Sequence, residues 1–162
     1  MIQVRGATLD DIPAMVQTHV RADWDTYSAL FGAQAYKLEA AKGELRWRRA
    51  LSNGDILWVA SDSVEMVGFG HAHRNRIGTL YLLRSHQRRG IGRALLKRLL
   101  SALKEAGIAE ARFDVIAIND NALAFYRAHG AYQVGQIISR DSRGDTVDLV
   151  FAISTDPALL RE

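Results

Sequence analysis

The chain contains no cysteine and only two prolines among its 162 residues. The absence of cysteine excludes a disulfide framework, a thiolate-bound zinc ion and any acyl transfer through a cysteine acyl-enzyme. Nowhere do about 18 apolar residues follow one another, and the first residues lack the basic segment and apolar core of a secretory signal. We therefore expect a cytoplasmic protein with no membrane partner, in which any acyl transfer would be direct.

The length and composition are those of one folded domain, which we expect to span residues 1–162. Apolar residues make up 48% of the chain and charged residues 24%, as is usual for globular proteins. The formal net charge is +3, and basic residues gather at Arg84, Arg88, Arg89, Arg93, Lys97 and Arg98. Such a cluster suits a phosphorylated cofactor, a nucleic acid, a membrane surface or simply a solvated helix face. Because no aromatic residues alternate with these side chains, we expect no nucleic-acid partner.

The spacing of apolar residues predicts alternating blocks of strand and helix. Helical signals occur after the capping residues at 8–13, at about Gln34–Leu51, from Ala94 to a glycine C-cap at Gly107, and at Asn119–His129. Segments rich in β-branched and aromatic residues predict strands at Ile2–Arg5, Ile56–Ala60, Met66–His73, Gly78–Leu83, Ala111–Ile118, Gln133–Arg140 and Thr146–Ile153. The expected fold class is α/β (α+β), a mixed, mostly antiparallel central sheet of about seven strands flanked by about four helices.

The most informative segment is the loop Gln87-Arg88-Arg89-Gly90-Ile91-Gly92, which joins an expected strand to the third helix. Unpaired N–H groups at the start of a helix attract a phosphate, and glycines let it approach the backbone. A tight strand-to-helix turn would also use glycines. The loop has neither the Gly-Lys-Ser/Thr ending of a Walker loop nor the third glycine of a dinucleotide fingerprint. Its Gln-x-x-Gly-x-Gly pattern resembles the coenzyme A pyrophosphate loop of the Gcn5-related N-acetyltransferase (GNAT) family.

A second motif is formed by Asn119, Ala122, Tyr126 and Gly130. Taken alone, Asn119 is a plausible helix N-cap, and Phe125–Tyr126 are plausible core aromatics. The spacing is nevertheless similar to the Asn-x-x-Ala-x-x-Phe/Leu-Tyr motif of the GNAT family, and the two motifs occur in the family's order. The chain departs from the family's usual residues at Arg84 and at Ala131–Tyr132, where we expect effects on packing and none on chemistry.

The resemblance implies a GNAT fold and an enzyme that transfers the acetyl group of acetyl-coenzyme A (acetyl-CoA) to an amine within a ternary complex, without a metal. The backbone of Leu80, Tyr81 and Leu82 would bind the pantetheine arm, and Asn119 would hydrogen-bond it. The pyrophosphate would be held by Arg88, Arg89, Gly90, Ile91, Gly92 and Arg93. Tyr126, a phenol with an ordinary pKa of about 10, would protonate the leaving thiolate. The alternative is a non-catalytic module that binds acetyl-CoA as a regulatory ligand.

Several residues are candidates for the general base that deprotonates the amine. Asp114 stands five residues before Asn119, where peptide and ribosomal-protein acetyltransferases of the family carry a glutamate base. His71 and His73 lie two residues apart, hence on one face of a strand, and are alternatives. Each of the three could equally be a hydrogen-bonded structural residue.

The acceptor site is expected just after the first helix, because a loop there covers the acceptor in the family. Asp23, Trp24, Tyr27 and Phe31 would lie in that loop. We expect Trp24, Tyr27 and His73 to contact the acceptor, a small cationic amine or a peptide amine. Homodimers are frequent in the family, so the resemblance also allows a homodimer.

Overall fold

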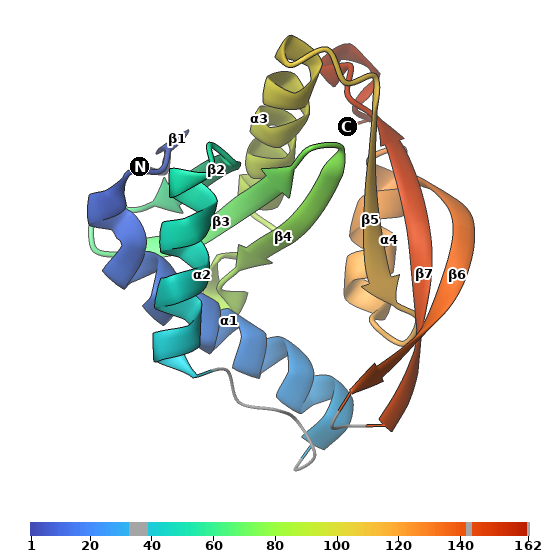
Figure 1. The fold of residues 1–162 in the computed structure, drawn as a ribbon, viewed down its shortest axis with the longest axis horizontal. Coiled ribbons are helices and arrows are strands. Elements are labelled where there is room, and N and C mark those ends of the chain that lie inside the picture. The colour runs from blue at the N-terminus through green and yellow to red at the C-terminus, as the bar shows by residue number, and fades with distance from the viewer. Residues whose placement is uncertain (33–38, 142–143, 162) are drawn as a thin grey trace.

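One seven-stranded sheet organises the structure, in the order β1-β2-β3-β4-β5-β7-β6 (Figure 1). The computed structural model describes residues 1–32, 39–141 and 144–161. The strands are β1 (Gln3–Gly6), β2 (Ile56–Ser61), β3 (Met66–His73), β4 (Arg76–Leu82), β5 (Glu110–Ile116), β6 (Tyr132–Asp141) and β7 (Gly144–Ser154). Neighbouring strands are antiparallel except β4 and β5, which are parallel. The mixed, mostly antiparallel sheet expected from the sequence is therefore confirmed.

Four α-helices flank the sheet in the described part of the chain, α1 (Ile12–Phe31), α2 (Ala40–Ser52), α3 (Ile91–Glu105) and α4 (Asp120–Ala128). α1 and α2 pack on one face of the sheet, and α3 and α4 share a hydrophobic cluster on the other (Figure 1). None of the helices in the described ranges combines the length and apolarity needed to cross a bilayer. The start expected for the second helix, residues 34–38, lies outside the described residues.

The first helix is longer than the sequence analysis expected. Residues 14–31 contain neither glycine nor proline, and the helix continues until Gly32, whose φ of 58° ends it. The expected loop with Asp23, Trp24, Tyr27 and Phe31 was therefore wrong, because these residues form the C-terminal half of α1. The side chains of this half of α1 therefore face the sheet or the solvent according to the helical period.

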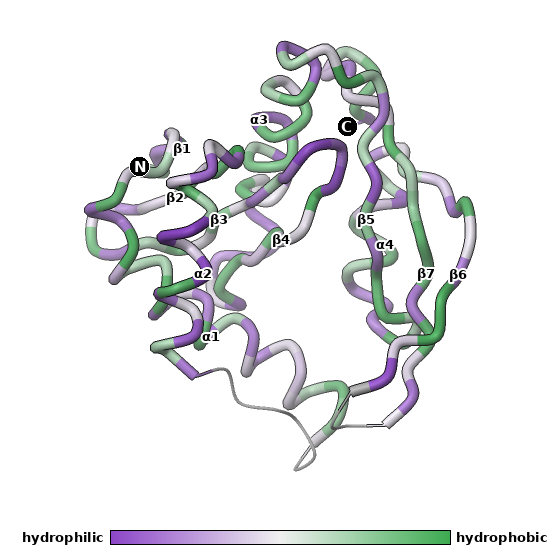
Figure 2. The backbone as a smooth tube through the Cα atoms, in the orientation of Figure 1, coloured by the Kyte–Doolittle hydropathy of each residue, from purple (hydrophilic) through white to green (hydrophobic). Residues whose placement is uncertain are grey.

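Each face of the sheet has its own packed core. On the α1–α2 side, Trp47 is fully buried, and its indole N–H donates to Nδ1 of His19 at 3.2 Å. On the opposite side, α3 lies so close to β3 that a Cβ on Gly70 would come within 2.8 Å of Leu99 Cδ1. The turn between β3 and β4 is strongly hydrophilic, whereas β7 is largely hydrophobic (Figure 2). The core on the α3–α4 side contains residues from both halves of the sheet, such as Ile77 of β4 and Phe113 of β5, and so connects them.

β4 and β5 separate soon after they meet. Only Arg76 and Arg112 are paired between them, and the strands diverge beyond that point (Figure 1). β4 also bulges at Gly78. Thr79 pairs with His71 of β3 and Ile77 pairs with Ala72, so Gly78 between them has no partner on β3. The divergence leaves an open strand edge in the middle of the sheet.

The N-terminus is attached to α1 through Asp11. This buried carboxylate accepts two hydrogen bonds of 2.7 Å from the Arg5 guanidinium and one of 2.8 Å from the Thr8 N–H. The hydrogen bonds from Arg5 are the main cause that lowers the pKa of Asp11 to about 2. Since a lowered pKa means that the folded state favours the charged form, Asp11 stabilises the fold at neutral pH.

We predict that Asp11→Asn lowers the free energy of unfolding at pH 7 by about 2 kcal/mol. The folded pKa is below the unfolded one, so this stabilisation is present above about pH 4 and is lost as the pH falls toward 2. Urea unfolding of both proteins at pH 7 and pH 3 measures the effect. The difference between them should shrink at pH 3, and an equal difference at both pH values would contradict the assignment.

Candidate functional site

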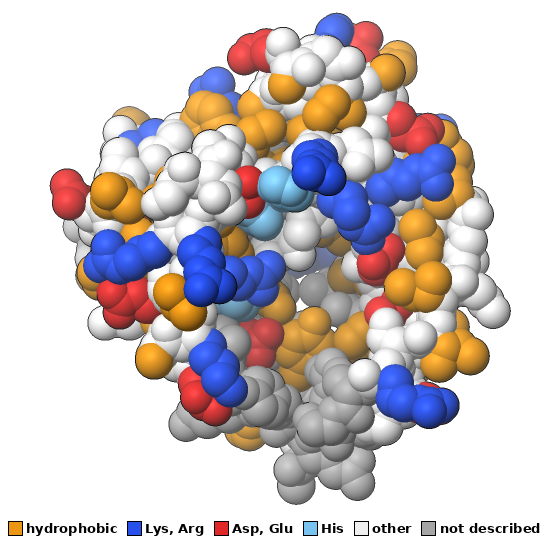
Figure 3. All heavy atoms as spheres, in the orientation of Figure 1, with side chains coloured by type: hydrophobic (Ala, Val, Ile, Leu, Met, Phe, Trp, Pro, Cys, Tyr) orange, Lys and Arg blue, Asp and Glu red, His pale blue; other side chains and the backbone are white. Residues whose placement is uncertain are grey.

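A cavity of about 710 Å³ occupies the gap between β4 and β5. The residues that line it come from α1, β4, the loop before α3, β5, α4 and the β6–β7 hairpin. The space-filling view is hollowed at this place, between the two halves of the sheet (Figure 3). Because the cavity joins segments from most of the chain, we treat it as the candidate active site.

The loop before α3 forms one end of the cavity. The Gln87 side-chain amide donates to the Leu82 carbonyl at 3.2 Å and holds the loop against the end of β4. Arg88 and Gly90 both have left-handed backbones, with φ of 62° and 77°. α3 begins at Ile91, so the N–H groups of its first turn have no partner within the helix. This backbone is shaped and polarised for an anion.

The two glycines of the loop meet different requirements. Gly90 has open space around it but needs the positive φ. A Cβ on Gly92 would lie 3.3 Å from Cε2 of Phe125, so glycine there lets α3 approach α4 closely. The close approach fixes the loop relative to α4.

The edge of β4 forms the long wall of the cavity. Leu80, Tyr81 and Leu82 line it, and beyond Arg76 no described strand pairs with β4 on that side. An unpaired edge leaves backbone N–H and C=O groups free to bind an extended ligand as an added strand.

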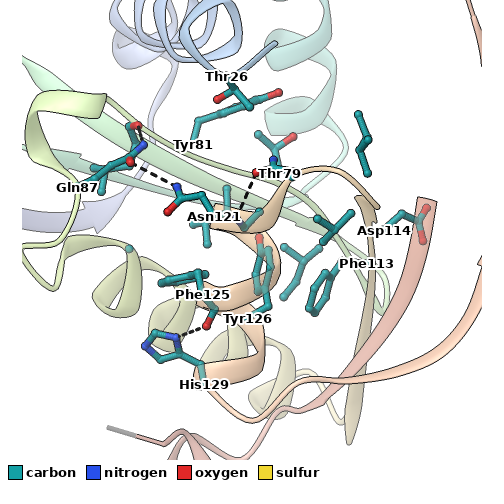
Figure 4. A pocket seen from close by; sticks show the side chains of 18 of the residues that line it. Thr26, Thr79, Tyr81, Gln87, Phe113, Asp114, Asn121, Phe125, Tyr126 and His129 are labelled. Atoms are coloured by element: carbon teal, nitrogen blue, oxygen red, sulfur yellow. Dashed lines mark hydrogen bonds between the residues drawn. The ribbon is translucent and has the colours of Figure 1, made fainter. Parts of the chain in front are cut away.

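The N-cap residue Asn119 and the buried phenol of Tyr126 on α4 both line the same cavity. Figure 4 shows the Tyr126 ring beside Phe113. The Asn119 Oδ1 accepts from the Ala122 N–H at 3.2 Å and caps the helix, which leaves its amide nitrogen as a donor. The Tyr126 ring is buried 4.2 Å from the Phe113 ring, centroid to centroid. Burial raises the pKa of Tyr126 well above its ordinary value, so the hydroxyl stays protonated at neutral pH. No described group hydrogen-bonds this hydroxyl, which is therefore a proton donor available to a ligand.

Two carboxylates line the cavity on the strands beyond β4. Oδ2 of Asp114, on β5, accepts from the Arg76 guanidinium at 2.6 Å. Oδ2 of Asp148, on β7, accepts from the Ser139 hydroxyl, whereas its Oδ1 is buried and has no hydrogen-bond partner among the described residues. The cavity is thus basic at the glycine loop and acidic on β5 and β7.

Comparison with known sequences identifies the family. The sequence model of the Acetyltransferase (GNAT) family matches residues 18–131. This chain belongs to the GNAT family. The N-acetyltransferase named YafP from Escherichia coli (strain K12), described as uncharacterized, is 30% identical over 104 residues, or 64% of this chain and 69% of YafP. The chain is therefore an N-acetyltransferase, as the resemblance implied.

Solved structures share the fold of this GNAT chain. YncA from Salmonella typhimurium, solved with its cofactor acetyl-CoA, superposes with a TM-score of 0.77 at 15% identity. The superposition covers 96% of this chain and 95% of the YncA chain. The PaiA N-acetyltransferase from Thermoplasma acidophilum, in complex with coenzyme A, superposes with a TM-score of 0.70 at 21% identity. This superposition covers 95% of this chain and 99% of the PaiA chain.

Most residues that the GNAT resemblance assigned to the cofactor meet at the cavity. Those that line it are Leu80, Tyr81, Leu82, Arg88, Gly90, Gly92, Arg93 and Asn119. Arg89 is exposed, whereas Ile91, the first residue of α3, is buried against Ala60 and Val67 of the sheet, and neither residue is among the lining residues. Ile91 could therefore contribute only its backbone N–H.

The expected acceptor residues are mostly not brought to the cavity. Tyr27 lines it, as expected, together with its neighbour Thr26. Trp24 is 40% exposed on α1 and is not among the lining residues. His73 is also absent from the lining, and its Nδ1 lies 2.7 Å from Oδ1 of Asp55.

Asp55 also holds the other histidine that was an alternative base. Its Oδ2 lies 2.7 Å from Nε2 of His71, which is buried on β3 against the Trp47 ring and does not line the cavity. Burial is the main cause that lowers the pKa of His71, so the ring favours its neutral form. The two histidines thus attach the β3–β4 hairpin to the turn before β2.

Several residues that line the cavity were not assigned to the site from the sequence, namely Asn121, Phe125, His129, Ser139, Thr146 and Asp148. A signal existed for two of them, because Ala122, Phe125, Tyr126 and His129 recur at the spacing of one helix face. His129 Nδ1 donates to the Phe125 carbonyl at 2.7 Å. The hairpin residues carry no comparable local pattern.

Proposed function

We propose that this GNAT chain binds acetyl-CoA between β4 and β5 and transfers the acetyl group directly to an amine acceptor. The observation that carries the proposal is an anion-binding loop and an unpaired, protonated Tyr126 hydroxyl in one cavity. The acetyl-CoA and coenzyme A in the yncA and PaiA structures support the donor. We also propose that residues 1–162 act as one acetyltransferase domain, since one continuous sheet runs through the chain.

The residues present fit such a donor. The glycine loop offers unpaired backbone N–H groups, and Arg88 and Arg93 add positive charge for a pyrophosphate. The open edge of β4 at residues 80–82 matches the amides of a pantetheine arm, and the Asn119 amide nitrogen adds a donor across the gap. A side chain at Gly90 or Gly92 would disturb this cradle.

Acetyl-CoA, when bound, supplies an acetyl thioester. A C–N bond forms between the amine and the acetyl carbon, the C–S bond breaks, and Tyr126 donates its hydroxyl proton to the departing sulfur. Because burial keeps the phenol protonated, the donor is available throughout the neutral range. Direct transfer agrees with the absence of cysteine for an acyl-enzyme.

We assign Asp114 to the amine's proton. Of the two carboxylates among the described lining residues, it lies on β5, the strand nearer to β4. Arg76 engages its Oδ2 and fixes the carboxylate, and Oδ1 can then accept a proton directly or through water.

We predict that Gly90→Val weakens acetyl-CoA binding at least about tenfold, since a left-handed backbone costs a residue with a side chain about 1–2 kcal/mol or more and the loop would leave its present conformation. Isothermal titration with acetyl-CoA measures the dissociation constant. Gly107→Val is the matched control, because Gly107 has a φ of 80° and open surroundings at the other end of α3. Equal loss of affinity in both variants would contradict a specific role for the loop.

Tyr126→Phe should lower kcat about 10²-fold while leaving the dissociation constant of acetyl-CoA unchanged, because only the proton donor is removed. Thiol release with a good amine acceptor measures kcat. Tyr132→Phe provides the control, since the Tyr132 hydroxyl bonds Glu110 outside the cavity and its loss should not change the rate. A full rate in Tyr126→Phe would assign the proton donor to water.

Asp114→Asn should reduce kcat/KM about tenfold or more at pH 7, and the loss should diminish as the pH rises because more of the amine is already neutral. A pH profile of kcat/KM for both proteins provides the measurement. In Arg76→Gln the carboxylate remains, so that variant should keep most of the activity. If the loss in Asp114→Asn is the same at every pH, Asp114 is not the proton acceptor.

A further inference from the structure

The charged residues that line the cavity are separated by sign. Among the described lining residues, the arginines are Arg88 and Arg93 at the glycine loop, and the carboxylates are Asp114 and Asp148. Asp114 lies on β5 and Asp148 on β7, both on the far side of the opening from β4. The arginine end suits a phosphate-bearing donor, so the carboxylate end is left to favour a positively charged group.

Only one of these carboxylates is already neutralised. Arg76 forms an ion pair of 2.6 Å with Asp114. Among the described residues, no arginine, lysine or histidine forms an ion pair with Asp148. Asp148 therefore carries the uncompensated negative charge of this end.

The Asp148 carboxylate is also short of one hydrogen-bond donor. Ser139 donates to Oδ2, but Oδ1 is buried without a partner. The nearby Thr146 hydroxyl bonds the Ser139 carbonyl instead, at 3.4 Å. A buried acceptor without a donor is costly, and more so when it is charged, so native structures seldom keep one without a reason.

We propose that Asp148 binds an ammonium group of the acceptor and that the acceptor is a di- or polycationic amine. This inference rests on the proposed function, because it names the acceptor class for the same cavity. An ammonium group in the cavity supplies the positive charge that the acidic end favours, and it supplies an N–H donor for Oδ1 once the Asp148 side chain turns this oxygen toward the opening.

The ammonium at Asp148 is a different group from the nitrogen that reacts. The reacting nitrogen must be neutral and must reach the acetyl carbon beside β4. β5 separates β7 from β4, and paired strands lie about 4.8 Å apart, so Asp148 lies about 10 Å or more from β4. A short carbon chain between two nitrogens, together with the length of the Asp148 side chain, spans such a separation. The acceptor thus carries a second amino group.

The remaining lining of the acceptor end agrees with a flexible amine. Thr26 and Tyr27 of α1 line the same cavity as Ser139, Thr146 and Asp148 of the hairpin. An aromatic ring such as that of Tyr27 can pack on an alkyl chain or face an ammonium group. α1 and the β6–β7 hairpin, the two segments that the motifs leave undefined, therefore determine the choice of acceptor.

The test compares 1,4-diaminobutane with n-butylamine, which has the same carbon chain but one charge fewer. For the wild-type protein, kcat/KM should be at least about tenfold higher with the diamine. Asp148→Asn keeps an acceptor for the Ser139 hydroxyl and removes the charge. It should abolish most of the diamine preference by raising KM, with little change in kcat and none in the kinetics with butylamine.

Asp145→Asn is the matched control, because Asp145 lies on the same hairpin, is paired with Arg140 in solvent and does not line the cavity. The unfolding midpoint and acetyl-CoA affinity of each variant verify the fold and the donor site. If the wild-type protein acetylates both amines equally, or if Asp148→Asn keeps the preference, this inference is wrong although the proposed function stands. If no amine leads to thiol release, the proposed function itself fails. The wild-type comparison decides even if Asp148→Asn does not fold.

Discussion

The candidate site depends on the divergence of β4 and β5 after the single pair Arg76–Arg112. Two parallel strands that stayed paired would satisfy each other's backbone groups and leave no space between them. Divergence gives β4 an open edge and creates the cavity of about 710 Å³. The loop into α3 follows β4, and α4 follows β5, so both helices begin at this opening. Gly92 then lets the two helices touch through Phe125, which keeps the glycine loop and Tyr126 in a fixed relation.

The buried and half-buried carboxylates differ in how their negative charges are compensated. Asp11 is bound by a guanidinium and a backbone N–H, and Asp55 by two histidines. Both have partners for each oxygen, and both connect parts of the fold. Asp114 is compensated by Arg76, whereas Asp148 retains an oxygen with no partner among the described residues. Since removal of charge from water is costly without a partner, an incomplete set of donors beside a cavity favours a ligand role.

Much of the fold and of the donor half of the site could be predicted from the sequence. The apolar stripe of α3, the glycine loop before it and the cap at Asn119 are local features, readable within one or two helical turns. The spacing from Asn119 to Tyr126 placed the phenol in the same cavity. The length of α1 was missed. A loop like that of the family was expected after the first helix, although the sequence there contains no helix breaker before Gly32.

The sequence by itself determined the order of elements, the glycine loop and the two motifs that identify the family. Only the tertiary structure decided which polar groups are paired. Nothing local distinguishes Asp148 from Asp145, yet one lines the cavity and the other meets Arg140 in solvent. Similarly, the strand period put His71 and His73 on one face, but Asp55 binds both from the turn before β2. Pairing depends on contacts between residues that are far apart in the chain, and these exist only once the sheet has formed.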